Sequence, residues 1–296
     1  LGRIGWTDAG SLAILAIGVA AIVGFFMWER RLTRRPGGRP LIDLSLFETP
    51  GFTWGVLLAS MGGLALVGLI FTMPQYSQGV LGVDPQGSGI RLLPIIVGLV
   101  AGAVPADRLS RRLGAKLTIA VGFAITTAGL LVGSTTAIDS NTWFMASWMA
   151  VVGFGMGSGF ATAASAALKH VPSDRSGVAS ALVQAMQKVG APFGAAILGS
   201  VLVSGYHSGL NLTGLPASLA DAVRLSVFAG VRVAETVHSP ALLLSVRQAF
   251  VHGMDLALLV SAAIAAVAML LALAFMPGRS RAGDAVPAAA REVGVA

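Results

Sequence analysis

One lysine stands inside a long apolar segment, accompanied by polar side chains that share its helical face. Residues 176–206 contain no Asp, Glu, Lys or Arg except Lys188. At ~100° per residue, its companions fall with it inside about a third of the helix circumference; they are Ser180, Gln184 and Gln187. A cation flanked by amides and a hydroxyl can bind the polar parts of a solute along an apolar path. Alternatively, Lys188 pairs with a buried carboxylate or snorkels without touching a solute.

A second group combines one carboxylate with three guanidinium groups between two glycines. Its members are Gly102, Asp107, Arg108, Arg111, Arg112 and Gly114. Arginine binds carboxylates and phosphates in bidentate fashion, and a neighbouring helix N-terminus or Arg would hold the aspartate. The cluster, expected on a short turn between two apolar segments, predicts a latch at one membrane face. The alternative is simple anchoring by positive charge.

Asp255 is a carboxylate next to the last apolar run. It follows His252, Gly253 and Met254, at the expected outer end of the last segment. Such a carboxylate is a possible outer-end acidic site. The alternative role is a helix-start cap and partner of the helix dipole.

Glycines with a spacing of four predict close helix packing. They are Gly153, Gly155, Gly157 and Gly159, to which the face opposite Lys188 adds Gly190 and Gly194. A nucleotide-binding loop would need a preceding strand and a following Lys-Ser/Thr, and neither is present. Small residues four apart instead let neighbouring helices approach closely.

Enzymatic and metal chemistry find no support in the sequence. There is no cysteine, and the four histidines, His170, His207, His238 and His252, lack the spacing of metal ligands. No catalytic set of paired Asp, Ser with Lys, or His with Glu is recognisable. We therefore expect no enzyme activity, no metal and no cofactor.

These groups must be positioned by membrane-spanning helices. Hydrophobic residues make up 55% of the chain and charged residues 11%, with a mean hydropathy of +0.81. The uncharged runs are 9–28, 51–83, 92–106, 117–138, 140–168, 176–206 (apart from Lys188) and 256–278. About 20 apolar residues cross a bilayer as a helix, and these runs lack the alternation of a membrane barrel. The sequence predicts an all-α polytopic membrane protein with seven spans.

The basic residues predict the orientation. Fourteen of the twenty Lys and Arg residues fall in alternate intervals between the spans or in the tail, which marks that side as cytoplasmic. The chain should therefore begin outside and end in the cytoplasm. The net charge of +7 is explained by topology and lipid phosphates, so the lipid bilayer is an expected partner and nucleic acid is not.

Several short motifs occur in an order that resembles one transporter family. They are Pro40-Leu41-Ile42-Asp43, Pro74-Gln75-Tyr76-Ser77-Gln78-Gly79, Gly89-Ile90-Arg91-Leu92-Leu93-Pro94, the Asp107 cluster, the glycines of 153–159, Val171-Pro172, Ser176-Gly177-Val178-Ala179 and Gln187-Lys188-Val189-Gly190. Together they resemble the C-terminal half of the fourteen-helix drug:proton antiporters of the major facilitator superfamily. The spacing Gly-x-x-x-x-Asp-Arg-x-x-Arg-Arg-x-Gly is similar to the helix-connecting signature of that superfamily.

The resemblance implies a domain organisation and a function. Residues 1–44 would hold the last linker helix and a basic cytoplasmic loop, and residues 45–278 the C-terminal six-helix bundle. The helical spacing of Leu219, Val223, Val227, Val231 and Ala234 predicts a short amphipathic helix in an external loop or cap at 206–251, and the composition of 279–296 predicts a disordered cytoplasmic tail. The chain would be half of a proton-coupled exporter of small amphipathic compounds in the plasma membrane, and its N-terminal half would be missing. Alternatives are export of a metabolite, lipid precursor or peptide, or a seven-helix receptor or membrane enzyme.

Overall fold

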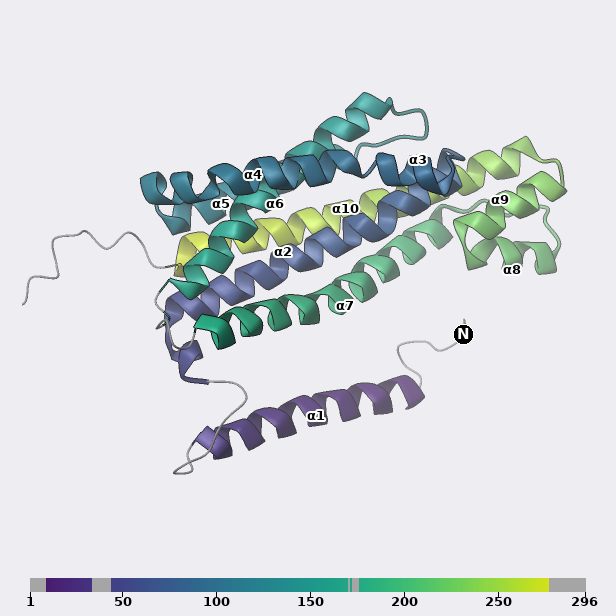
Figure 1. Cartoon of the computed structure of the whole chain (residues 1–296). Helices are drawn as coiled ribbons and strands as arrows, with labels where there is room; N and C mark the ends of the chain where they lie inside the picture. The colour runs from purple at the N-terminus through teal and green to yellow at the C-terminus, as the bar shows by residue number, and fades with distance from the viewer. Residues whose placement is uncertain (1–8, 34–43, 170, 172–175, 277–296) are drawn as a thin grey trace, which may run out of the picture.

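Most of the described residues are helical, and none of them forms a strand. The computed structural model describes residues 9–33, 44–169, 171 and 176–276 (Figure 1). Six segments in these ranges are long and apolar enough to cross a membrane: Pro50–Val80, Pro85–Leu113, Ala115–Gly133, Thr142–Leu168, Ser176–Gly209 and Pro240–Phe275. The predicted fold class is confirmed.

The spans contain the following elements. The first joins α2 (Pro50–Gln75) to the π-helical turn η2 (Tyr76–Val80), and the second joins α3 (Pro85–Ile90) to α4 (Leu93–Leu113). The others are α5 (Ala115–Gly133), α6 (Thr142–Leu168), α7 (Ser176–Gly209) and α10 (Pro240–Phe275).

The remaining predicted span, residues 9–28, is the first in the chain and corresponds to α1 (Ala9–Thr33). A short 3-10 helix, η1 (Leu44–Glu48), follows it. The apolar helical stretch of α1, Ala16–Glu29, is shorter than the six spans and is not one of them. A span at this position stays a prediction. The expected basic loop around 34–43 and the tail after 276 lie outside the described residues.

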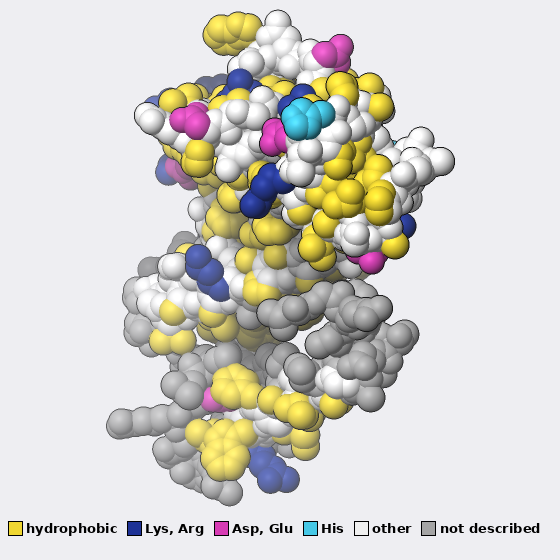
Figure 2. Space-filling view, turned by 90° about the vertical axis from the view of Figure 1, so that its right-hand side faces the viewer, with side chains coloured by type: hydrophobic (Ala, Val, Ile, Leu, Met, Phe, Trp, Pro, Cys, Tyr) yellow, Lys and Arg dark blue, Asp and Glu magenta, His cyan; other side chains and the backbone are white. Residues whose placement is uncertain are grey.

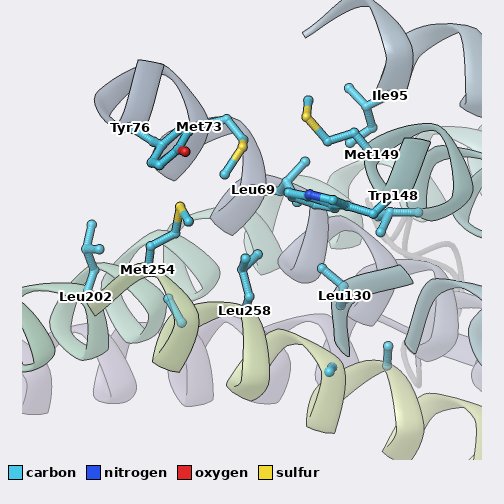
Figure 3. Close-up of a cluster of buried hydrophobic side chains, with 14 of the residues drawn as sticks. Leu69, Met73, Tyr76, Ile95, Leu130, Trp148, Met149, Leu202, Met254 and Leu258 are labelled. Carbon is cyan, nitrogen blue, oxygen red and sulfur yellow. The ribbon is translucent and has the colours of Figure 1, made fainter. Parts of the chain in front are cut away.

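Six helices form a bundle of two unequal layers. Helices α4, α6, α2 and α7 are neighbours in that order, while α5 packs across α4 and α6, and α10 packs across α2 and α7. All six meet in one buried cluster, which includes Leu69, Ile95, Leu130, Trp148, Leu202 and Leu258 (Figure 3). No further described helix packs across the other side of the four-helix layer.

The two ends of the bundle differ. We call the end that carries α3 and the α5 to α6 connection the cap end, and the end that carries Gly114 the turn end (Figure 1). At the turn end, Trp54 stacks on Phe275 with 4.4 Å between ring centroids. Seen from the cap end, side chains of both charge signs lie among hydrophobic ones, as expected for a surface outside the hydrocarbon core (Figure 2).

Glycines allow α6 to pack backbone to backbone on both sides. A Cβ added at Gly153 or Gly157 would overlap carbonyl oxygens of α4, and one at Gly155 would lie 2.6 Å from the Gly122 carbonyl oxygen of α5. A Cβ on Gly159 would be 3.6 Å from the Gly122 Cα. The two interleaved glycine pairs therefore face two different helices, which explains why α6 is the most buried span.

The cap-end segment departs from its predicted boundaries. Helix α7 continues to Gly209 and α10 begins at Pro240, so the segment between them is shorter than the predicted 206–251. It contains two short helices, α8 (Ala217–Leu225) and α9 (Val227–Thr236), instead of one. Ser226 separates them because its backbone is extended and its side chain accepts a hydrogen bond from Ala229 N.

The Ser239 side chain caps α10 by accepting from Leu242 N, and proline occupies the first turn. The cap helices are tied to α7 through Tyr206, whose hydroxyl donates to Val223 O at 2.9 Å. They also reach η2, because a Cβ added at Gly79 would meet the Val227 side chain of α9. The cap is therefore packed on the bundle rather than being a free loop.

Candidate functional site

The polar group on α7 lies on the side that its neighbours leave open. Gln184 and Lys188, one helical turn apart, are both exposed, and Ser180 and Gln187 are half-buried. The structure thus places the four predicted residues on and beside one stripe of α7.

The opposite side of α7 is fixed against α2 by glycines. A Cβ at Gly190 would lie 2.9 Å from the Ser60 carbonyl oxygen, and one at Gly194 would lie 2.7 Å from that of Leu64. Such close contact leaves no room for α7 to rotate and bury its polar stripe without repacking. Packing at the glycines therefore decides that Gln184 and Lys188 point out of the bundle.

Lys188 lies deep along its span. It is twelve residues after Ser176, or ~18 Å along the helix. Within the described residues it forms no ion pair or hydrogen bond, so the structure shows no buried carboxylate for it. A charged Lys at the centre of a span costs about 2.5–3.5 kcal/mol on insertion scales, and such residues usually face a cavity or a protein partner. A cavity or a protein partner therefore costs a charged Lys188 less than lipid tails would.

The arginine cluster lies on a helix rather than on a turn. Helix α4 continues to Leu113, so Asp107, Arg108, Arg111 and Arg112 occupy its last two turns. The connection to α5 is Gly114 alone, at φ +87°, a conformation that a side chain would strain. The expected short turn carrying these charges is therefore wrong, because α4 is longer than its uncharged run.

Asp107 is held by an arginine of its own helix. Arg111 donates from Nη2 and Nε to one Asp107 oxygen, at 2.8 and 3.0 Å. Both side chains are largely exposed, 73% for Asp107 and 79% for Arg111. An exposed i,i+4 pair contributes only about 0.3–0.5 kcal/mol to stability. Gly102 is separate from these charges: it packs against the Phe154 carbonyl of α6.

Asp255 is not at a helix start. Helix α10 begins fifteen residues earlier, at Pro240, so the capping role considered for Asp255 is wrong. The residue is half-buried, and its Oδ1 is buried with no hydrogen-bond partner in the described part of the chain. No ion pair joins it to Lys188. The two candidate residues lie on different helices, α10 and α7.

One site was missed by the sequence reasoning. A pocket opens at the cap end between η2, the α3 to α4 junction and the start of α6. Arg91 is its only charged lining residue, and methionines from two helices form much of its wall. Its residues are far apart in the sequence and share no spacing, so only the isolated charge of Arg91 offered a signal. Among the described residues, no group of three His, Asp or Glu could hold a metal ion.

Comparisons with known proteins agree with this architecture. Residues 2–195 match the Major Facilitator Superfamily. The chain is 29% identical over 280 residues to the tetracenomycin C resistance and export protein of Streptomyces glaucescens, covering 91% of this chain and 51% of that protein.

Two mycobacterial proteins are similar as well. The multidrug resistance protein Stp of Mycobacterium tuberculosis is 29% identical over 238 residues, 77% of this chain and 41% of Stp. The multidrug efflux pump LfrA of Mycolicibacterium smegmatis is 26% identical over 274 residues, 90% of this chain and 54% of LfrA. The chain spans about half the length of these relatives. With a family match over most of its length and six apolar spans, the chain belongs to the Major Facilitator Superfamily of transporters.

Proposed function

We propose that this chain is the C-terminal half of a proton-coupled exporter of small amphipathic compounds in the plasma membrane, of the fourteen-helix group. The exposed stripe of α7 around Gln184 and Lys188 lines the substrate path. The N-terminal half of the same transporter covers this stripe and completes the path. Export then proceeds by alternating access, in which the two bundles rock against each other around a central cavity.

One observation carries this proposal. Lys188 is exposed deep within a membrane span and forms no pair with any described residue. A second bundle with a water-filled cavity between the halves supplies the polar surroundings that the charge requires. The relatives named for antibiotic or multidrug export, which are about twice as long as this chain, support both the second bundle and the cargo.

The Asp107 cluster acts at the turn end as a latch in this proposal. The Arg111 pair orients the Asp107 carboxylate, and the exposed guanidinium groups of Arg108 and Arg112 bind carboxylates or phosphates of the other half. Asp255, with its unpartnered oxygen, is a candidate acidic site on the proton path.

The test compares Lys188→Ala with Val100→Ala in the complete transporter. Val100 is an exposed α4 residue thirteen positions from the turn end, at ~20 Å, which matches the depth of Lys188. Efflux of several cationic and neutral compounds is measured in vesicles with and without a proton gradient. We expect Lys188→Ala to change rate or substrate range and Val100→Ala to leave both near wild type. Equal effects of the two variants would contradict the path assignment.

The same assay shows which substrates are transported and whether transport depends on the proton gradient. Efflux that persists after a protonophore collapses the gradient would contradict proton coupling. Movement of only one metabolite, lipid precursor or peptide would replace the multidrug proposal with the narrower alternative. Residues 1–296 reconstituted alone should insert yet move nothing, and robust efflux by them would contradict the half-transporter proposal.

Orientation is tested with single cysteines, since this chain has none. Ser110→Cys, at the turn end, should react with a membrane-impermeant maleimide only from the cytoplasmic side. Ser208→Cys, at the cap end, should react only from outside. The reverse labelling pattern would invert the proposed topology.

A further inference from the structure

The pocket at the cap end is bounded by three separate spans. It has a volume of about 130 Å³. Its lining residues come from the end of α2 and η2, from the α3 to α4 junction and from the start of α6. Those that decide its chemistry are Met73, Ser77, Arg91, Thr142, Met145 and Met149. We call it the methionine pocket.

The polarity of the methionine pocket changes with depth, because its helices run in opposite directions. Helix α2 runs toward the cap end, so Met73 lies one turn deeper than Ser77. Helix α6 runs away from the cap end, so Met149 lies about two turns deeper than Thr142. The methionines and Ser77 are buried, whereas Thr142 and Ile90 are exposed. The pocket thus has a partly polar mouth and a largely apolar floor, part of which, Met73 and Met149, appears in Figure 3.

A single positive charge stands in this pocket. Arg91 is half-buried, and its side chain makes no hydrogen bond or ion pair with any described residue. No acidic residue lines the pocket. A guanidinium group that is partly withdrawn from water is best satisfied by a carboxylate, sulfonate or phosphate, which it binds in bidentate fashion. The hydroxyl groups of Ser77 and Thr142 add possible hydrogen bonds to the same anion.

The apolar floor suits a flexible or variable group. Methionine side chains are unbranched and polarisable, so they adapt to ligands of different shape. The volume is below the roughly 300–1,000 Å³ of sites for drug-sized molecules, which indicates a small ligand such as a single alkyl chain or one ring.

We propose that the methionine pocket binds a small amphipathic anion, with its anionic group at Arg91 and its apolar body against Met73, Met145 and Met149. The site is distinct from the α7 stripe, since α2, α4 and α6 form it. The inference needs neither proton coupling nor export, so it stands or falls separately from the proposed function.

The experiment measures protection of a cysteine at the pocket mouth. Thr142→Cys is introduced into the complete transporter, freed of any other cysteine and reconstituted without a gradient in phosphatidylcholine vesicles, with or without phosphatidylglycerol. Maleimide labelling is followed with decane-1-sulfonate, decan-1-ol or decyltrimethylammonium below their micellar concentrations. We expect only the sulfonate to slow labelling severalfold. Trp143→Cys, next to the pocket but outside its lining, is the control site and should be unaffected.

The role of Arg91 is tested in the same background. Arg91→Gln should raise the protecting sulfonate concentration about tenfold or more, the scale of a lost charge-assisted hydrogen bond. The protecting sulfonate concentration for Arg91→Lys should lie between those for Arg91→Gln and wild type, because lysine keeps the charge but not the bidentate geometry. Arg232→Gln, an exposed arginine of α9, is the matched control. Ala146→Phe should abolish protection by filling the pocket while leaving Arg91 in place.

Three outcomes would overturn the inference. The first is equal protection by sulfonate, alcohol and cation, which would mean that only the apolar tail matters. The second is unchanged protection in Arg91→Gln. The third is protection that requires phosphatidylglycerol in the bilayer and does not respond to added sulfonate, which would assign Arg91 to a lipid headgroup.

Discussion

Helices α4 and α7 are the two least covered spans of the bundle, yet their open sides differ in chemistry. The exposed large side chains of α4 between its first residue and the Asp107 cluster are all aliphatic: Leu93, Ile96, Val97, Val100 and Val104. The exposed side of α7 carries Gln184 and Lys188 at comparable depth. Lipid tails can cover the first surface at little cost, whereas the charge and the amide on the second favour water or protein. In a membrane bundle, an exposed side chain thus points to a functional surface when it is polar, whereas an exposed apolar side chain does not.

The largest expected effect comes from placing a charge on the α4 surface. Val100→Lys should impair membrane insertion by about 3 kcal/mol, because the side chain faces lipid near the middle of the span. Gln184→Lys puts the same charge on α7 and should cost much less. The measurement is the inserted fraction of each variant at equal synthesis. Similar losses for both would mean that the two open sides meet the same environment.

The second largest effect is expected from the glycine contact that sets the orientation of α4. Gly157→Ala adds a Cβ against the Leu99 carbonyl of α4, and overpacking of this kind costs about 1–3 kcal/mol. Gly199→Ala on α7 meets only the edge of Phe71 at 3.9 Å and should be tolerated. Thermal unfolding in detergent should show a lower Tm for Gly157→Ala alone. Matching Tm values would show that α4 can shift without cost.

A smaller effect is expected from the amide on the α7 stripe. Gln184→Ala removes one hydrogen-bonding group, worth about 0.5–1.5 kcal/mol, so transport of hydrogen-bonding substrates should slow by roughly 2- to 10-fold. Uptake into inverted vesicles measures this rate, with Val97→Ala on α4 as control. An identical change for purely apolar and hydrogen-bonding substrates would argue that Gln184 acts on packing instead.

The smallest change in stability is expected at the turn end of α4. Asp107→Asn should alter stability by no more than ~0.5 kcal/mol, since its ion pair with Arg111 is exposed. It should nevertheless slow efflux, because the proposed latch needs the carboxylate. Asp221→Asn in the cap breaks a similar exposed pair with Arg224 and is the matched control. Equal transport in both variants would reduce the Asp107 cluster to a membrane anchor.

Local sequence was sufficient to predict the spans. Long uncharged runs and the absence of water in the bilayer core leave helices as the only continuous solution, so six of the seven predicted segments match described spans. Boundaries were less predictable, because charged residues can extend a helix beyond the apolar run. Helix α4 continues through Asp107 and Arg112, and α10 begins sixteen residues before the predicted start at residue 256. The role of Asp255 was misjudged for the same reason.

The sequence by itself determined which residues are polar, small or charged within each span, because period and composition are local properties. It therefore indicated the stripe around Lys188 and the packing role of the glycines. Only the tertiary structure decided that Gly157 faces α4 while Gly155 faces α5, and that α7 turns Lys188 outward. It alone brings Met73, Arg91 and Met149 into one pocket. The physical reason is that the rotation and order of helices depend on contacts between distant segments, which no local pattern specifies.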